Sequence, residues 1–188
     1  MREAWPEKVV VTEAHPPNVK LATDRLAPLG VTVIDIDMRE GRPFPFDDAS
    51  FDLVINRHSA LNIGEIARVL TLGGTLLTQQ VHGMWAADLL AEFGATPVWP
   101  DATPEKYVSW IHEAGLKLVD LQDWQGDLGF VDVGVLVYYL KVVPWLVPGF
   151  SVETHVDTLL RLQEQLDDGG KLIYAAKKYI IEARKSLE

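Results

Sequence analysis

Four short apolar segments constrain the fold of this chain most strongly. They occupy residues 9–11, 31–37, 51–56 and 75–81, and they are rich in the β-branched residues that buried strands favour. Residues 16–29 and 63–70 carry apolar side chains at helical spacing. Short apolar strands that alternate with helices are typical of a mostly parallel sheet with helices on both faces. The sequence therefore predicts an α/β, Rossmann-like fold.

The second half of the chain is less regular. Thr103 is a good helix cap and precedes a proline at the first helical position. Ser151 also has a hydroxyl side chain that can cap a helix, and it precedes another helical pattern. Residues 130–143 fit either a strand or a helix, and we favour a helix that ends at Pro144. Strands are predicted at residues 116–121 and 171–185.

Length and composition set the class of protein. The chain has 188 residues, which suits a single domain, a formal net charge of −10, and no cysteine. It therefore has no disulfide or thiolate site, and it lacks the basic footprint of a nucleic-acid-binding protein. No apolar run is long enough to span a bilayer, and no apolar leader begins the sequence. We expect a cytoplasmic protein that binds neither nucleic acid nor membranes. The five histidines lack ligand spacing, so no metal is expected.

Three segments together carry a family resemblance. Residues 9–13 form a strand that ends in an acid, and residues 45–54 combine a Pro-Phe turn with Ser-Phe-Asp and an apolar strand. Residues 65–77 read as a helix, a double glycine and a further strand. In this order and at these separations, the segments resemble the class I S-adenosylmethionine-dependent methyltransferases, specifically the small-molecule enzymes. The resemblance implies a single domain over residues 1–188, with a cofactor-side half over 1–83 and an acceptor-side half with the closing strands over 84–188.

The resemblance implies which residues bind S-adenosylmethionine. Glu13 takes the position of the acid that holds the ribose hydroxyls, and Ala14 and His15 follow it. A helix-capping acid is the alternative for Glu13. Asp37 takes the position of the acid near the adenine amino group, and Met38 would pack on the adenine face. A loop acid and a surface methionine are the alternatives for these two residues.

The segment after the third strand, residues 56–58, takes the position beside the methionine part of the cofactor and the methyl acceptor. The resemblance places Asn56 near the cofactor. His58 has a pKa near neutrality and could serve as a general base, while Arg57 could hold an acceptor carboxylate. A loop pair that bonds backbone groups is the alternative. Methyl transfer often needs only alignment of the reacting groups, so a base is not obligatory.

The most diagnostic part of the family pattern is absent. It is a strand with a glycine-rich turn, and in the family it lies in the middle of the sheet, between the strands at residues 9–11 and 51–56. Removing one strand leaves a gap of about two 4.8 Å spacings. The neighbouring strands could close directly on each other, or a partner copy could fill the gap through a strand swap or a homo-oligomer. A third possibility, which we favour, is that the sequence is a truncated piece of a longer product.

Two functions follow from these observations. The leading hypothesis is an enzyme that transfers a methyl group from S-adenosylmethionine to a small-molecule acceptor, with activity impaired by the truncation. The alternative is a non-catalytic, methyltransferase-like interaction module, because the missing turn is the part that would cradle the cofactor.

Overall fold

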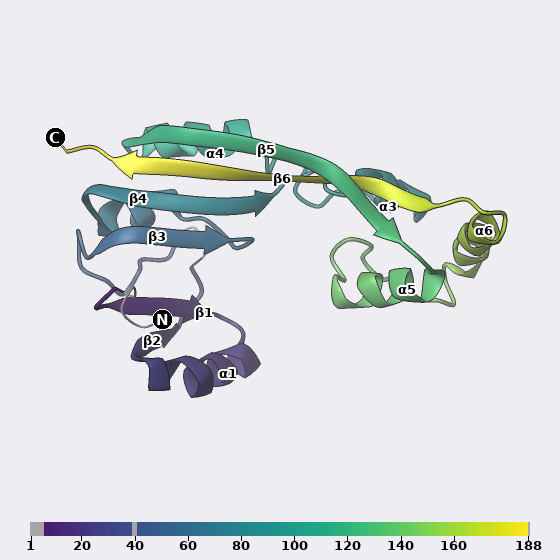
Figure 1. Cartoon of the computed structure of the whole chain (residues 1–188), viewed down its shortest axis with the longest axis horizontal. Helices are drawn as coiled ribbons and strands as arrows, with labels where there is room; N and C mark the ends of the chain where they lie inside the picture. The colour runs from purple at the N-terminus through teal and green to yellow at the C-terminus, as the bar shows by residue number, and fades with distance from the viewer. Residues whose placement is uncertain (1–5, 39–40, 188) are drawn as a thin grey trace.

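A computed structural model of the protein describes residues 6–38 and 41–187. The chain begins with a strand–helix–strand unit made of β1 (Val9–Glu13), α1 (Pro16–Leu26) and β2 (Val31–Asp35), with a single 3-10 turn at Ala27–Leu29 (Figure 1). The two strands pair in parallel, from Val9 opposite Val31 to Glu13 opposite Asp35. We call this part the N-terminal unit.

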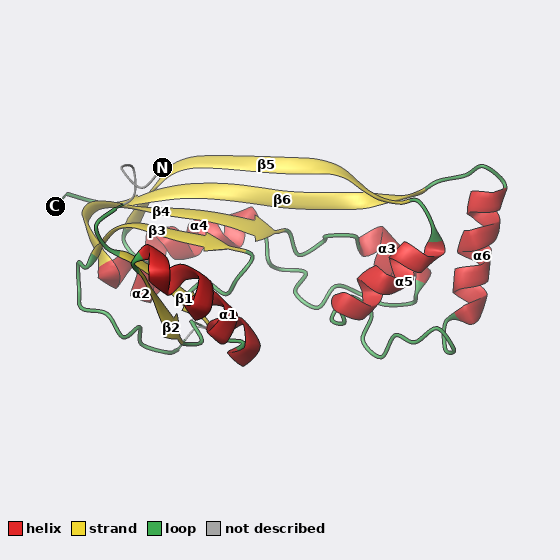
Figure 2. Cartoon of the chain, turned by 60° about the horizontal axis from the view of Figure 1, so that its bottom comes forward, coloured by secondary structure: helices red, strands yellow, loops and turns green. Residues whose placement is uncertain are grey.

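A second sheet has four strands in the order β3-β4-β6-β5. Its strands are β3 (Phe51–Arg57), β4 (Leu70–Val81), β6 (Leu172–Lys185) and β5 (Leu116–Phe130). The β3–β4 pair is parallel, and β6 is antiparallel to both β4 and β5. The helices α2 (Ile63–Val69) and α4 (Pro104–Glu113) lie behind this sheet in Figure 2, whereas α1 lies in front of its own strands. The predicted α/β, Rossmann-like fold is confirmed, although the four-stranded sheet is mixed rather than mostly parallel and its helices α2 and α4 cover one face.

The predicted gap in the middle of the sheet is present. β1 pairs only with β2, β3 pairs only with β4, and the two sheets are separate. The free edge of β1 and the free edge of β3 face each other across the gap (Figure 1). The possibility that the two strands close directly on each other is therefore wrong. The separation follows from the order of the strands, because no described strand is available to lie between β1 and β3.

The chain has two hydrophobic cores. The main core lies between the four-stranded sheet and α2 and α4, and it includes Leu76, Ile111, Tyr179 and Ile181. Beyond the end of β4, the long strands β5 and β6 continue as a two-stranded antiparallel ribbon (Figure 1). There they meet α3 (Ala87–Glu92), α5 (Val133–Val142) and α6 (Val156–Asp167), which together enclose the second core. We call this second part the distal lobe.

Several predicted element boundaries are confirmed and others are wrong. Thr103 caps α4 by accepting a hydrogen bond from the amide of Lys106, and residues 130–143 contain the helix α5. The predicted cap at Ser151 is wrong, because its hydroxyl accepts from Thr154 in a turn before α6 begins. The double glycine does not end α2. That helix ends at Val69, and β4 follows immediately at Leu70.

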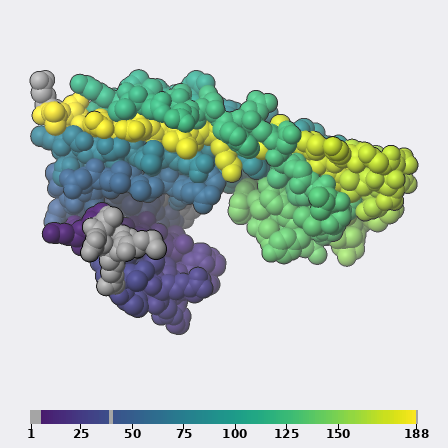
Figure 3. Space-filling view, viewed as in Figure 1, coloured from purple at the N-terminus to yellow at the C-terminus, as the bar shows by residue number. Residues whose placement is uncertain are grey.

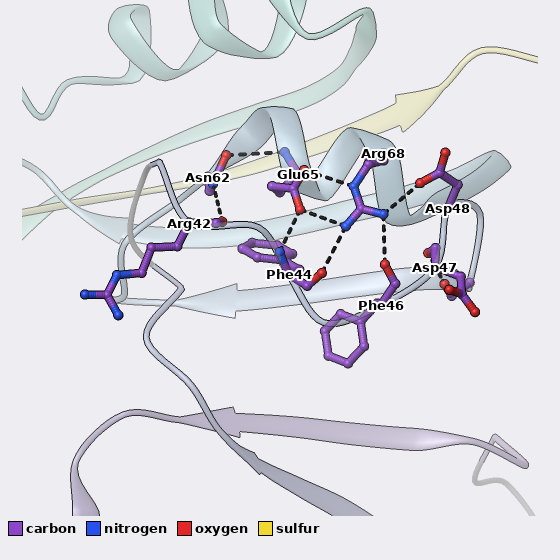
Figure 4. A network of polar contacts seen from close by, with 9 residues as sticks. Arg42, Phe44, Phe46, Asp47, Asp48, Asn62, Glu65 and Arg68 are labelled. Carbon is purple, nitrogen blue, oxygen red and sulfur yellow. Dashed lines mark hydrogen bonds and ion pairs between the residues drawn. The ribbon is translucent and has the colours of Figure 1, made fainter.

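A network around Arg68 joins the two family-like segments of the main sheet (Figure 4). The guanidinium donates to both carboxylate oxygens of Glu65, at 2.9 and 2.7 Å, and to Asp48 at 2.7 Å. It also donates to the carbonyl oxygens of Phe44 and Phe46, at 3.1 and 2.8 Å. Glu65 in turn accepts from the amide of Phe44. All five N–H groups of one arginine thus fix the loop before β3 onto α2.

Within the described residues, no helix is both long enough and apolar enough to cross a bilayer.

Candidate functional site

The carboxyl ends of the parallel strands meet at one edge of the fold, where open α/β sheets bind ligands. Glu13 ends β1 directly opposite Asp35, the last residue of β2. One Glu13 oxygen, Oε1, accepts from the amides of Ala14 and His15, both at 2.8 Å. These bonds hold the pKa of Glu13 below its ordinary value, and the bond from His15 has the largest effect. The other oxygen, Oε2, accepts a longer hydrogen bond of 3.4 Å from the side-chain amide of Asn18. Glu13 is therefore an ionised carboxylate with one oxygen firmly bound and one weakly bound.

The residues after β1 and β2 have structural roles in this arrangement. Ala14 and His15 orient Glu13 through their amides, and the carbonyl of His15 accepts from Asn18 and Val19 at the start of α1. Met38 is half-buried and packs against the main core. Asp37 is also half-buried. The predicted cofactor residues Glu13, Ala14 and His15 are thus contiguous at one strand end.

Asn56, near the end of β3, belongs to a polar network on the covered side of the sheet. Its carbonyl oxygen accepts from Gln80 at 2.7 Å and from the hydroxyl of Thr78 at 3.4 Å, and its amide donates to the carbonyl of Ala60. Gln80 also donates to the carbonyl of Ser59. Gln80 and Thr78 are buried, and a buried polar group without a hydrogen-bond partner destabilises the fold. These bonds provide the partners. The network fixes the loop that follows β3.

Arg57 and His58 lie at the end of β3. The Arg57 guanidinium donates to Gln79 at 3.1 Å, which ties it to β4. His58 has a left-handed backbone conformation, with φ of 54°, and its amide donates to the carbonyl of Gln79 at 2.9 Å. Burial, followed by the charges of Arg57 and Lys178, lowers the pKa of His58 below its ordinary 6.5. The imidazole is therefore neutral at pH 7 and can accept a proton.

Aromatic and polar side chains also lie at the end of β4. The His82 ring meets Tyr179 of β6 edge-on, with 6.3 Å between the ring centroids. Tyr179 is 1% exposed, and its hydroxyl has no hydrogen-bond partner among the described residues. Gly83 donates its amide to the carbonyl of Ala102, and a side chain at Gly83 would overlap the carbonyl of Trp99. The loop before α4 therefore lies directly over this strand end.

The strand ends open onto a hollow of the molecular surface. Figure 3 shows it between the purple N-terminal unit and the green distal lobe. Two other hollows lie elsewhere, with volumes of about 270 and 370 Å³. The first is lined by residues of α2 and α4, including Asn62 and Trp110, and the second by Lys8 and the loop before β3. Neither is lined by Glu13 or His58.

Two residues at this edge, Lys178 and Tyr179, were not predicted from the sequence. Lys178 of β6 lies close enough to His58 to lower its pKa and sits 5.1 Å from the ring centroid of Trp85. Tyr179 is adjacent to it and faces the main core. Both come from the last strand, whose pairing with β4 brings residues 178–181 beside residues 78–81. The sequence predicts a strand at residues 171–185, but it does not reveal the antiparallel register of that strand with β4.

Comparison with known proteins agrees with this geometry. Residues 1–78 match the family model described as a methyltransferase domain. A comparison with curated proteins found no match. Many solved structures match the fold. A candidate methyltransferase from Bacillus halodurans C-125 is 18% identical with a TM-score of 0.63, and the match covers 95% of this chain and 83% of that one.

Two further structures show the range of activities on this fold. A geranyl diphosphate methyltransferase in complex with S-adenosylmethionine is 16% identical with a TM-score of 0.56, over 98% of this chain and 71% of that one. The [4+2]-cyclase SpnF is 17% identical with a TM-score of 0.58, over 100% of this chain and 70% of that one. At these identities the likeness concerns the fold, and a shared fold does not fix the reaction.

The strand order and the likeness to solved methyltransferase structures define an α/β fold of the kind that these enzymes have. Residues 1–78 match the methyltransferase domain family, and the resemblance drawn from the sequence is confirmed by this match together with the solved structures.

Proposed function

We propose that this protein binds S-adenosylmethionine at the carboxyl ends of β1, β2 and β3 and transfers its methyl group to a small-molecule acceptor. The state of Glu13 carries the proposal. Its Oε1 is held by two backbone amides at 2.8 Å, which fixes the carboxylate at the end of β1. Its Oε2 has one long contact and remains able to accept from a ribose hydroxyl. A purely capping acid needs only the first of these features.

The neighbouring residues fit a cofactor with a nucleoside part. Asp35 is register partner to Glu13, and Asp37 and Met38 follow two and three residues later. We assign Glu13, with Ala14 and His15 as its supports, to the ribose side, and Asp37 with Met38 to the adenine side. Asn56 would act near the methionine part by fixing the loop after β3. The bound cofactor supplies an electrophilic methyl group on a sulfonium.

The acceptor side rests on Arg57 and His58. His58 is neutral at pH 7 because its pKa is lowered, so it can take the proton that an acceptor hydroxyl or amine loses on methylation. Arg57 is held by Gln79 at the same edge and offers its remaining N–H groups to an anionic acceptor group. The hollow between the N-terminal unit and the distal lobe would hold the acceptor (Figure 3).

Calorimetric titration with S-adenosylhomocysteine, the demethylated product, tests cofactor binding. We expect Glu13→Gln to weaken binding at least tenfold, because a hydrogen bond to a charged group contributes about 1.5–3 kcal/mol. Glu164→Gln is the matched control, since Glu164 is an exposed acid of α6 in the distal lobe. Equal affinity of the parent chain and Glu13→Gln would remove Glu13 from the site.

The methyl-transfer step has a separate test. With a panel of small acceptors, His58→Asn should lower the rate about 100-fold or more at saturating cofactor while the affinity for S-adenosylhomocysteine stays within twofold. An unchanged rate would mean that alignment alone drives the reaction and that His58 is not a base.

The alternative function is a non-catalytic, methyltransferase-like interaction module. The unpaired edges of β1 and β3 favour it, because they leave the strand ends that would hold the cofactor in two separate sheets. A chain that binds no S-adenosylhomocysteine at millimolar concentration, yet is folded, would support the module and contradict the enzyme.

A further inference from the structure

Two positive side chains at the carboxyl ends of the main sheet lack an acidic partner. They are Arg57 of β3 and Lys178 of β6, and neither forms an ion pair with any residue in the ranges 6–38 and 41–187. The whole chain has 27 acidic residues and only 17 lysines and arginines. Two neighbouring bases that no acid neutralises, in a chain with this excess of acids, favour the binding of an external anion.

The register of the strands places the two bases on one face of the sheet. Arg57 pairs with Gln79 of β4, and Gln79 pairs with Ile180 of β6. Lys178 is two residues from Ile180, so it projects from the same face. Two strand spacings and two residue rises separate the Cα atoms of Arg57 and Lys178, which gives about 12 Å. Both side chains are long, and the Gln79 and Ile180 side chains between them carry no charge, so one bound anion can contact both.

This face is the one that turns away from α2 and α4. On β6, Tyr179 and Ile181 are buried in the main core, which contains those helices. The alternate positions Leu172 and Tyr174 are buried in the distal lobe, which therefore packs on the other face of the strand. Lys178 belongs to that second face and lies level with the end of β4, where the distal lobe begins in Figure 1. It thus borders the hollow between the N-terminal unit and the distal lobe.

Two tryptophans flank Lys178. The Trp85 ring packs against the distal lobe and donates from Nε1 to the Tyr139 hydroxyl at 3.1 Å, and the Lys178 ammonium lies 5.1 Å from its centroid. Trp124 of β5 is the register partner of Lys178, so it lies on the same face, and it is 50% exposed. A side chain at Gly126 would overlap the Trp124 ring, so this indole lies along the ribbon. The two rings provide flat apolar surface beside the charge.

We propose that Arg57 and Lys178 together bind an oxyanion group of the methyl acceptor, while Trp85 and Trp124 contact its planar, apolar body. The inference rests on the proposed function and narrows its acceptor to planar organic acids that carry a carboxylate or a phosphate.

The two bases have different parts in this recognition. The Nε of Arg57 donates to Gln79, which leaves the two terminal nitrogens as a fork for the oxyanion. Lys178 supplies a point charge whose position is fixed against Trp85. Both charges act on His58 and lower its pKa, so an acid held by them lies within reach of that imidazole. Lys178 is therefore a specificity-determining residue and takes no part in proton transfer.

A chemical-shift titration of the full 188-residue chain, with and without S-adenosylhomocysteine, tests the proposal. The probes are 4-hydroxybenzoate and phenyl phosphate, with 4-hydroxybenzamide as the uncharged counterpart of the first. At least one acid should bind tenfold or more tightly than the amide, and the tighter acid identifies the oxyanion. Lys178→Met should weaken that acid at least tenfold and leave the amide within twofold. Lys178→Arg should retain most of the preference for the acid, because it keeps the charge.

Lys177→Met is the matched control, because it removes the same charge from the adjacent residue, which projects from the opposite face of β6. It should leave the affinity for the acid within twofold. Equal affinities for both acids and the amide would overturn the inference, as would equal losses in Lys177→Met and Lys178→Met, which would reflect net charge alone. The proposed function fails separately. A chain that prefers the acid but binds no S-adenosylhomocysteine would contradict methyl transfer, whereas one that binds S-adenosylhomocysteine without preferring the acid would contradict only the anion site.

Discussion

The N-terminal unit and the four-stranded sheet are built from similar strands but are buried very differently. All five residues of β1 are half-buried, and α1 has no buried residue. Val31, at 5% exposed, is the one buried hydrophobic residue of the unit's described elements. In the four-stranded sheet, Leu76 and Ile181 are completely buried. Sequence alone does not separate the two regions, because Val9–Glu13 is as β-branched as any strand of the main sheet.

The difference shows that a parallel strand depends on its neighbours more than on its own composition. β4 has a partner on each edge and a helix layer against one face, whereas β1 has one partner and faces the gap on its other side. Most of the hydrophobic stabilisation therefore lies in the main core and the distal lobe. The N-terminal unit should open at a lower free energy than the rest of the chain.

Two alanine substitutions, one in each region, should give the largest difference between the regions. Ile181→Ala removes a fully buried side chain from the main core and should lower the free energy of unfolding by about 2–5 kcal/mol. Val10→Ala removes a half-buried side chain from β1 and should cost less than about 1 kcal/mol. Urea unfolding followed by near-ultraviolet circular dichroism measures both values. Equal costs would contradict the contrast between the two regions.

Loss of the Arg68 network should have the next largest effect. Arg68→Ala removes the guanidinium donors of Glu65 and of two carbonyl oxygens and leaves Glu65 with the amide of Phe44, which should lower the midpoint of thermal unfolding by several degrees. Arg68→Lys keeps the charge but loses the paired geometry, so its cost should fall between those of the parent and the alanine variant. Lys20→Ala on α1 is the control, because Lys20 forms an exposed pair with Asp24 that contributes little. Thermal unfolding of the three variants ranks them, and an Arg68→Ala variant as stable as Lys20→Ala would contradict the assigned role.

The pH dependence of stability should show a smaller effect from the same network. Hydrogen bonds from Arg68 and from the amide of Phe44 lower the pKa of Glu65 from 4.5 to about 2. Because the folded pKa lies below the unfolded one, the contribution of Glu65 is complete above pH 4.5 and is lost as the pH falls toward 2. In Glu65→Gln, the free energy of unfolding should decline less steeply across this range. Parallel declines in the two proteins would assign the acid sensitivity to other carboxylates.

Most of the fold was predictable because local signals and tertiary structure agree. Thr103 and Pro104 begin α4 as their side-chain chemistry predicts, and α5 ends before Pro144. The far part of β5 was not predictable. The prediction ended at Leu121, but the strand continues to Phe130 through polar residues and two glycines. Its partner β6 runs the full length beside it, so pairing determines the strand where composition does not.

The site was predictable to the extent that it follows strand ends. Glu13 and His58 could be placed because each follows an apolar strand. Their supports could not be placed, because Lys178 comes to His58 from a strand 120 positions later in the sequence. The hydrogen bonds of Arg68 join residues 20 to 24 positions apart, and they depend on a loop path that no local pattern specifies.

Limited proteolysis with trypsin tests the contrast between the two regions most directly. It compares helical sites, namely Lys20 and Arg25 of α1 with Lys106 of α4 and Arg161 of α6. Cleavage within a helix requires local opening, so its rate reports how often each region opens. Under native conditions we predict that α1 is cut at least tenfold faster than α4 or α6. Cleavage of all three helices at the same rate would contradict the account, because it would mean that the N-terminal unit opens only when the whole chain unfolds.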